Sequence, residues 1–431
     1  MGGLSAGRRS RSRASGAVAV AAAVAILAAA CGGDDGDAGG AALGDGSLGV
    51  VDVAPGQSIE VRSLLAISDV GSGPSSERMV RMAVADYGPI HGFEVNVEAL
   101  DDGCSPAGGE AAGAAIAADA SVVGVVGTTC SVAAVTAVPL VTGAGMAMVS
   151  PSNTSPLLTS DGAGAPGPHR YEGYYRTSGN DLHQGAAVAR FLYSQRGVTA
   201  AAAVHTGDAY TQSLAEAFIA TFERLGGRIT GVGEFADDQT DVVPTLEALA
   251  AGGPQGLFMS VSLTVGTAIV ERIGEVPGLA GVPLVANEGL LDVAFMSVPQ
   301  TAGIFFAGPD VRFGDNTNQG TGVSAADLAV RYREAHGADP DGAFWGHAYD
   351  AAVLLLEAIA AASARDGDSL RIDRAGVREY LSGLAAYQGV IGPITCDAWG
   401  DCGSQRNDIV EHTDPSDIAA TRTNVVFEYE P

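Results

Sequence analysis

The chain has 431 residues, a formal net charge of −27 at pH 7, and 47% hydrophobic but only 6% aromatic residues. This length allows two or three lobes, each large enough to bury a core of its own. The acidic balance argues against nucleic acid and anionic membrane surfaces as partners, and the composition favours a soluble α/β protein.

The first 31 residues have the features of a targeting segment. Arginines at positions 8, 9, 11 and 13 precede an apolar run over 17–30, which ends in Ala28-Ala29-Ala30-Cys31. That ending resembles a bacterial lipoprotein cleavage box, so we expect a signal peptide over residues 1–30 and a lipid on Cys31. Secretion with cleavage at the A-x-A motif is the alternative. Residues 31–57 are rich in Gly, Asp and Ala, which predicts a flexible tether.

A first alternating series of strands and helices follows the predicted tether. The expected strands are 59–67, 93–100, 122–126, 146–149 and 173–177, and the expected helices are 76–87, 110–119 and 132–141.

A second series of the same kind begins near residue 181. The expected helices are 181–196, 211–225, 242–251 and 264–273, and the expected strands are 200–205, 228–235, 256–262, 283–286 and 304–307. Helices 325–336 and 344–362 have apolar faces suited to cover the first series. Such alternation predicts an α/β protein with mainly parallel, doubly wound sheets in two lobes. We assign residues 58–176 plus 309–391 to lobe 1 and residues 177–308 plus 392–431 to lobe 2.

Ser131 stands where the buried strand 122–126 turns into a helix. We expect it to be the helix N-cap, with its hydroxyl and free backbone N–H groups at the carboxyl end of the sheet. The helix dipole makes this position favourable for a carboxylate. An ordinary helix cap is the alternative interpretation.

The cysteines agree with export from the cytoplasm. If Cys31 takes a lipid, Cys104, Cys130, Cys396 and Cys402 remain, and outside the cytoplasm they should pair. Three pairings are possible, and the short spacing between Cys396 and Cys402 favours closure on itself, which leaves Cys104 with Cys130. Zinc binding is the competing interpretation, but neither pair has CxxC spacing and no histidine lies nearby.

Several ordered motifs resemble the type I periplasmic binding proteins of the leucine/isoleucine/valine class. The motifs are Asp101-Asp102-Gly103-Cys104, Gly127-Thr128-Thr129-Cys130-Ser131, Ser150-Pro151-x-x-Thr154-x-Pro156, Tyr174-Tyr175-Arg176-Thr177, Asp208-x-Tyr210, Asn287-Glu288-Gly289 and Gly389-Val390-Ile391-Gly392-Pro393. The likeness covers nearly all of residues 59–428. It implies two lobes joined by a multi-strand hinge, which close on an amino acid and deliver it to an ABC-type permease.

The resemblance also implies a site. Family members hold the ligand carboxylate at positions that match Ser131, Asn153 (through its backbone) and Thr154, and they place an aromatic and an acid for the ammonium group at the positions of Tyr210 and Glu288. These residues and Asp208 each follow a predicted strand, where open α/β sheets place ligand contacts. The family's lobe-one cysteine pair corresponds to Cys104 and Cys130, and we expect this disulfide to brace the loop that presents Ser131.

The sequence departs from the family at the pocket for the ligand side chain. Residues 68–77 contain no aromatic, and Leu263-Thr264 also lacks the aromatics expected there. A preference for branched aliphatic ligands is therefore not inherited.

Other functions find less support. The chain has no P-loop, no G-x-S-x-G and no H-E-x-x-H motif, and its seven histidines lack metal-ligand spacing, so we expect no enzyme, cofactor or metal site. We expect a monomer, held at the outer face of the cell membrane by Cys31, with an amino acid and a permease as partners. A ligand sensor of the same fold, or a receptor for an amide, urea or short peptide, remains the alternative.

Overall fold

The structure is a computed structural model, and it describes residues 2, 44–68 and 72–431. The predicted signal peptide (apart from residue 2), the predicted lipid position Cys31 and residues 31–43 of the predicted tether lie outside the described residues. Within the described ranges, no helix is long and apolar enough to cross a membrane.

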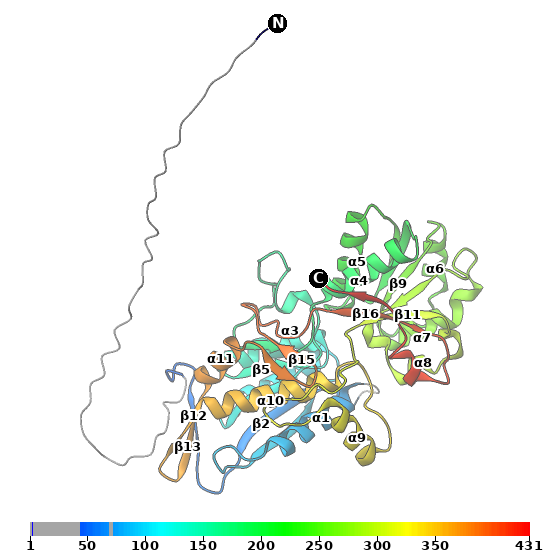
Figure 1. Cartoon of the computed structure of the whole chain (residues 1–431). Coiled ribbons are helices and arrows are strands. Elements are labelled where there is room, and N and C mark those ends of the chain that lie inside the picture. The colour runs from blue at the N-terminus through cyan, green and yellow to red at the C-terminus, as the bar shows by residue number, and fades with distance from the viewer. Residues whose placement is uncertain (1, 3–43, 69–71) are drawn as a thin grey trace. The chain divides into compact units, whose positions relative to one another are not determined.

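A five-stranded parallel sheet, which we call sheet 1, is formed by the first series of elements (Figure 1). Its strands, in the spatial order β3-β2-β4-β5-β6, are β2 Ile59–Leu65, β3 Val95–Asp101, β4 Val122–Gly127, β5 Ala147–Ser150 and β6 Tyr174–Arg176. One face packs against α1 (Ser72–Tyr87) and α10 (Trp345–Ala361), and the other against α2 (Pro106–Ala117) and α3 (Ser131–Gly143). Because both faces are covered, β4 is buried along its whole length.

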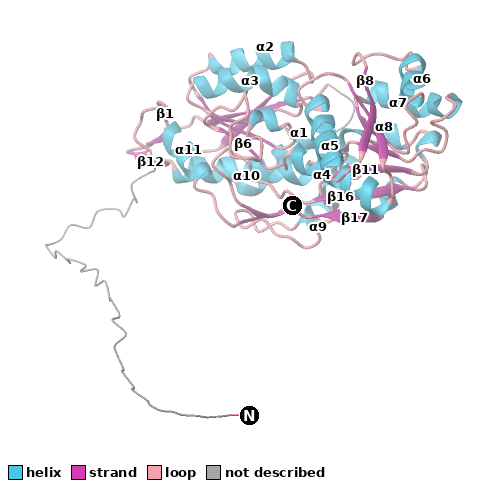
Figure 2. Ribbon diagram, turned by 90° about the horizontal axis from the view of Figure 1, so that it is seen from above, coloured by secondary structure: helices cyan, strands magenta, loops and turns pink. Residues whose placement is uncertain are grey.

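A seven-stranded mixed sheet, sheet 2, is built mainly by the second series (Figure 2). Its strands, in the order β17-β16-β11-β10-β9-β7-β8, are β7 Ala200–His205, β8 Arg228–Glu234, β9 Leu257–Ser260, β10 Leu284–Ala286, β11 Ile304–Gly308, β16 Asn407–His412 and β17 Val425–Tyr429. Strands β7 to β11 run parallel, and β16 and β17 are antiparallel to their neighbours. The helices on its two faces are α4 Asp181–Arg190 and α5 Thr211–Arg224 on one, and α6 Val243–Ala250, α7 Leu263–Arg272, α8 Val293–Met296 and α12 Ile418–Thr421 on the other.

A small antiparallel sheet corrects the predicted tether. Strand β1 (Val50–Val53) pairs with β13 (Ser369–Asp373), which also pairs with β12 (Ser363–Asp366). Val51 and Val53 are buried, so this part of residues 31–57 belongs to the folded body. The remaining elements are α9 Ala325–His336, α11 Arg374–Ser382 and the hairpin β14 Tyr387–Gly389 with β15 Gly392–Ile394.

Three chain segments run between the two sheets: after β6, after β11 and before β16. The first and third lie side by side, since the N–H of Arg176 donates to the carbonyl of Gly400 (2.9 Å) and the N–H of Cys402 donates to the carbonyl of Arg176 (3.0 Å). The predicted α/β class with mainly parallel sheets is confirmed.

Candidate ligand-binding site

The turn between β4 and α3, residues 128–131, presents Ser131. Disulfides join Cys104 to Cys130 and Cys396 to Cys402, which are the pairings that the sequence predicted. The predicted N-cap role of Ser131 is wrong by one residue, because Cys130 has the extended backbone of the cap and Ser131 is already helical. No side chain caps α3, and the Ser131 hydroxyl instead accepts a hydrogen bond from the N–H of Ser155 (3.3 Å).

Asp102 ties this turn to the end of β3. Its buried carboxylate accepts the N–H groups of Cys104 (2.8 Å), at one end of the first disulfide, and of Thr129 (2.7 Å), which precedes Cys130 at the other end. Burial raises the pKa of Asp102 to about 6, although these hydrogen bonds oppose the shift. The turn is therefore held by a covalent bond and by a carboxylate.

The loop after β5, residues 150–156, contains Asn153 and Thr154 and is named the Thr154 loop. The N–H of Asn153 donates to the hydroxyl of Ser150 (3.0 Å), and its carbonyl accepts from Arg176 and Ser178 (3.1 and 2.6 Å). Both backbone groups of Asn153 thus have protein partners, and the ligand contact through this backbone stays a prediction. Thr154 is buried, and its carbonyl accepts the N–H of Asp181, the first residue of α4 (2.9 Å).

Asp208, at the start of α5, is a helix cap. Its carboxylate accepts from the N–H groups of Tyr210 (2.8 Å) and Thr211 (3.2 Å) and from the hydroxyls of Thr206 (2.9 Å) and Thr211. These bonds occupy the carboxylate and fix the backbone that carries Tyr210. The direct ligand contact of Asp208 stays a prediction.

Tyr210 and Glu288 are brought together, and two residues missed from the sequence join them: Asp181 and Gln184 on α4. Glu288 follows β10 and accepts a short hydrogen bond from the side-chain amide of Gln184. The Tyr210 hydroxyl and both carboxylate oxygens of Asp181 are buried without hydrogen-bond partners of normal geometry. An acid at the first turn after a strand could have indicated Asp181, but the sequence there was interpreted only as a helix start.

Asp181 and Glu288 form a buried acid pair. Burial raises the pKa of Asp181 well above its usual value, the charge of Glu288 raises it further, and Arg176 opposes both. Burial also raises the pKa of Glu288, against hydrogen bonds from Tyr210 and Gln184. The pKa of Tyr210 is raised by burial and by the charges of both acids. A cationic group placed among these side chains would relieve their mutual repulsion.

A small hollow adjoins Asp181 and Gln184. It is lined by Thr154, Gly179, Asn180, Asp181, Gln184, Pro309, Phe344, Ser404, Arg406 and Asn407. Phe344, which precedes α10, is its one large apolar side chain and was not predicted as a site residue. The loops of the two sheets also touch here, since the Ser155 hydroxyl donates to the carbonyl of Ala209 (2.7 Å).

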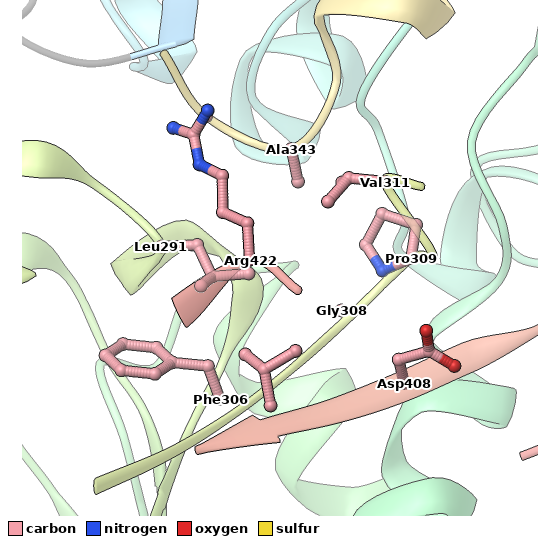
Figure 3. A pocket seen from close by; sticks show the side chains of 10 residues that line it. Leu291, Phe306, Gly308, Pro309, Val311, Ala343, Asp408 and Arg422 are labelled. Carbon is pink, nitrogen blue, oxygen red and sulfur yellow. The ribbon is translucent and has the colours of Figure 1, made fainter. Parts of the chain in front are cut away.

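A second hollow shares Pro309 with the first as a lining residue (Figure 3). It is mainly apolar, and its residues are Leu291, Phe306, Gly308, Pro309, Val311, Gly342, Ala343, Asp408, Val410 and Arg422. It contains none of the predicted site residues. The hollow beside the acid pair is therefore the better candidate site.

The chain is similar to known binding proteins in sequence and in fold. Residues 68–403 match the model of a family described as periplasmic binding protein. A Leu/Ile/Val-binding protein homolog from Brucella melitensis biotype 1 is 24% identical over 332 residues, which are 76% of this chain and 82% of that protein.

Solved structures with the same fold include the leucine binding protein LivK from Thermotoga maritima (TM-score 0.71, 21% identity, 83% of this chain and 96% of that chain). LivJ from Streptococcus pneumoniae, in complex with isoleucine, has a TM-score of 0.65 at 18% identity and covers 86% of this chain and 99% of its own. A solute binding protein from R. palustris, in complex with benzoate, also has a TM-score of 0.65, at 16% identity over 82% of this chain and 93% of its own.

Proposed function

The chain belongs to the periplasmic binding protein family, and on this premise we propose that it is an extracytoplasmic substrate-binding protein of an ABC importer. It captures an amino acid between two lobes built on sheets 1 and 2 and delivers it to a membrane permease. The observation that carries this proposal is the buried acid pair beside the Thr154 loop. Its two carboxyl groups repel each other, and the oxygens of Asp181 have no hydrogen-bond partner of normal geometry, so the pair calls for a cationic ligand group.

The opposite end of the site suits a carboxylate. Helix α3 begins with backbone N–H groups that no side chain caps, and the Ser131 hydroxyl lies in its first turn. An α-amino acid presents an ammonium and a carboxylate about two bonds apart, and it therefore matches a site with one acidic and one N–H-rich end. Ser131, Thr154, Asp181, Tyr210 and Glu288 are the residues that we assign to ligand contact.

A thermal-shift screen with matched ligands tests the proposal, because a ligand that binds only the folded protein raises its melting temperature. L-Leucine is compared with leucinamide, which lacks the carboxylate, and with 4-methylpentanoic acid, which lacks the ammonium. We expect stabilisation by amino acids and a smaller shift with both controls. Stabilisation by benzoate or 4-methylpentanoic acid, with none by any amino acid, would contradict the ammonium site.

We also propose that Cys31 carries the lipid that holds the protein at the outer face of the cell membrane. The proposal rests on the leader and the Ala-Ala-Ala-Cys ending of the signal sequence. Mass spectrometry of the mature N-terminus should find an acylated Cys31, and a Cys31→Ala variant should be released into the medium or periplasm. An unmodified Cys31 at the mature terminus would favour plain secretion.

A further inference from the structure

The second disulfide supports the ligand site from outside it. We propose that the disulfide loop, residues 396–402, positions the Thr154 loop through a buried ion pair between Asp401 and Arg176. The inference rests on the proposed function only in treating the Thr154 loop as part of a ligand site.

Arg176 is the contact between the two loops. It lies in β6, its side chain is fully buried, and it donates to the carbonyls of Asn153 (3.1 Å) and Ser155 (2.8 Å). These two carbonyls flank Thr154 on either side. A third hydrogen bond, to the hydroxyl of Thr159 (2.7 Å), holds the residues that follow the Thr154 loop. The orientation of one guanidinium group therefore fixes the backbone around Thr154.

Asp401 holds that guanidinium group. One carboxylate oxygen pairs with Nε of Arg176, and the other accepts from Asn180 (3.1 Å) and Thr159 (3.2 Å). Burial opposes the charge of Arg176, but Asp401, together with Tyr174 and Asp181, outweighs it and raises the pKa of Arg176. A buried arginine whose carboxylate moved away would be left with an unpaired charge, which is strongly unfavourable. The position of Asp401 therefore determines where the Arg176 guanidinium group lies.

The disulfide loop keeps Asp401 in place. Cys402 follows Asp401 directly and is bonded to Cys396, while the N–H of Asp401 donates to the carboxylate of Asp397 (2.9 Å). The loop lies beside β6 as an additional strand segment, with Asp401 opposite Arg176. It is therefore braced both by a covalent bond and by the sheet edge.

The two disulfides consequently brace different parts of one site. Cys104–Cys130 holds the turn that presents Ser131, and Cys396–Cys402 acts on the Thr154 loop through Asp401 and Arg176. The N–H of Ser155 donates to the Ser131 hydroxyl (3.3 Å), which joins the two braced segments. Asp401 and Arg176 are positioning residues and need not touch the ligand.

Hydrogen exchange measured by mass spectrometry on the full folded chain tests the proposal without a ligand. In the double variant Cys396→Ser/Cys402→Ser, and in Asp401→Asn, we expect peptides covering 150–160 and the N–H of Asp181, which bonds to Thr154, to exchange about tenfold faster or more. Peptides covering 127–135 should change little. The matched control, Cys104→Ser/Cys130→Ser, should give the reverse pattern.

Ligand affinity gives a second readout. With L-leucine as the probe in calorimetry, we expect a loss of about tenfold in Asp401→Asn and partial recovery in Asp401→Glu, which keeps the charge. Faster exchange confined to 396–402, or spread evenly over all peptides, would overturn the proposal. If the wild-type protein does not bind any amino acid, the proposed function fails, whereas the exchange pattern still decides this inference.

Discussion

The two halves of the candidate site differ in how completely their polar groups are satisfied. On the sheet 1 side, Asp102, Asn153 and Arg176 make hydrogen bonds to neighbouring backbone groups, and two disulfides brace the loops. On the sheet 2 side, the oxygens of Asp181 and the hydroxyl of Tyr210 are buried without hydrogen-bond partners of normal geometry. The polar groups named on the sheet 1 side are hydrogen-bonded, as in a protein core, whereas those on the sheet 2 side still have unused hydrogen-bonding capacity.

On the proposed function, this difference indicates how ligand recognition would be divided between the two halves of the candidate site. A braced loop with fixed N–H and hydroxyl donors loses little entropy when a ligand binds, so this half would fix the orientation of the ligand. A buried acid pair destabilises the folded protein until a cation compensates it, so it supplies the electrostatic preference. The comparison can be tested by changing each half separately.

The largest expected effect comes from neutralising the acid pair. Asp181→Asn or Glu288→Gln should weaken the binding of L-leucine, or of the amino acid found in the screen, by roughly a hundredfold or more, since an ammonium loses a buried charged partner. The same changes should raise the melting temperature of the ligand-free protein, because they remove buried repulsion. Calorimetry and thermal unfolding measure the two effects. Glu247→Gln, on the exposed face of α6, is the control and should change neither.

A smaller loss of affinity is expected on the braced half. Ser131→Ala removes one hydroxyl donor to a charged carboxylate, which is worth about 1.5–3 kcal/mol, or roughly ten- to a hundredfold in affinity. The melting temperature of the ligand-free protein should also fall, because the N–H of Ser155 loses its acceptor. Calorimetry with the same ligand provides the measurement. Unchanged affinity here, together with a large loss in Glu288→Gln, would place the whole ligand on the sheet 2 side.

The pH dependence of stability should separate the halves further. Folding raises the pKa of Asp181 and Glu288, so the folded protein binds more protons than the unfolded chain above about pH 4. The contribution of these acids to stability is therefore retained below that pH and is lost as the pH rises through their folded-state pKa values. Ligand-free Asp181→Asn should show a flatter decline in melting temperature between pH 4 and pH 8 than the wild type. Parallel curves of melting temperature against pH for the variant and the wild type would show that Asp181 and Glu288 do not repel each other.

The smallest effect on affinity is expected at Asp208. Loss of its cap in Asp208→Ala should destabilise the protein by about 0.5–2 kcal/mol in denaturant unfolding. Affinity should fall by less than about tenfold, through looser placement of Tyr210 only. A loss as large as that of Glu288→Gln would mean that Asp208 contacts the ligand, contrary to its hydrogen bonds.

The regular alternation of strands and helices was sufficient to predict both sheets and most of their elements. Strand β1 was missed because Val50–Val53 is preceded by a run of Gly, Asp and Ala, and its stability depends on β13, more than 300 residues away. Local composition carries no information on such a partner.

The site was predicted only in part, again because local sequence does not show which distant residues a side chain contacts. Residues at the carboxyl ends of strands could be selected from order alone, but a cap and a ligand contact have the same local sequence. Asp208, an acid at the start of a helix, turns out to bond its own backbone, whereas Asp181, in the same kind of position, does not. Only the packing of α4 against sheet 2 distinguishes the two.

The hydrogen bond from Ser155 to the carbonyl of Ala209 has a consequence for the balance between open and closed arrangements. It joins loops from the two sheets and involves only protein atoms, so its contribution to closure is the same for every ligand. A neutral hydrogen bond worth about 1 kcal/mol changes a closing equilibrium several-fold. On the proposed function, strengthening it would raise the apparent affinity for all ligands alike. It would also increase the fraction of empty receptors that present a closed surface to the permease. A change at Ser155 that raises the affinity would therefore also raise the fraction of closed receptors that carry no ligand.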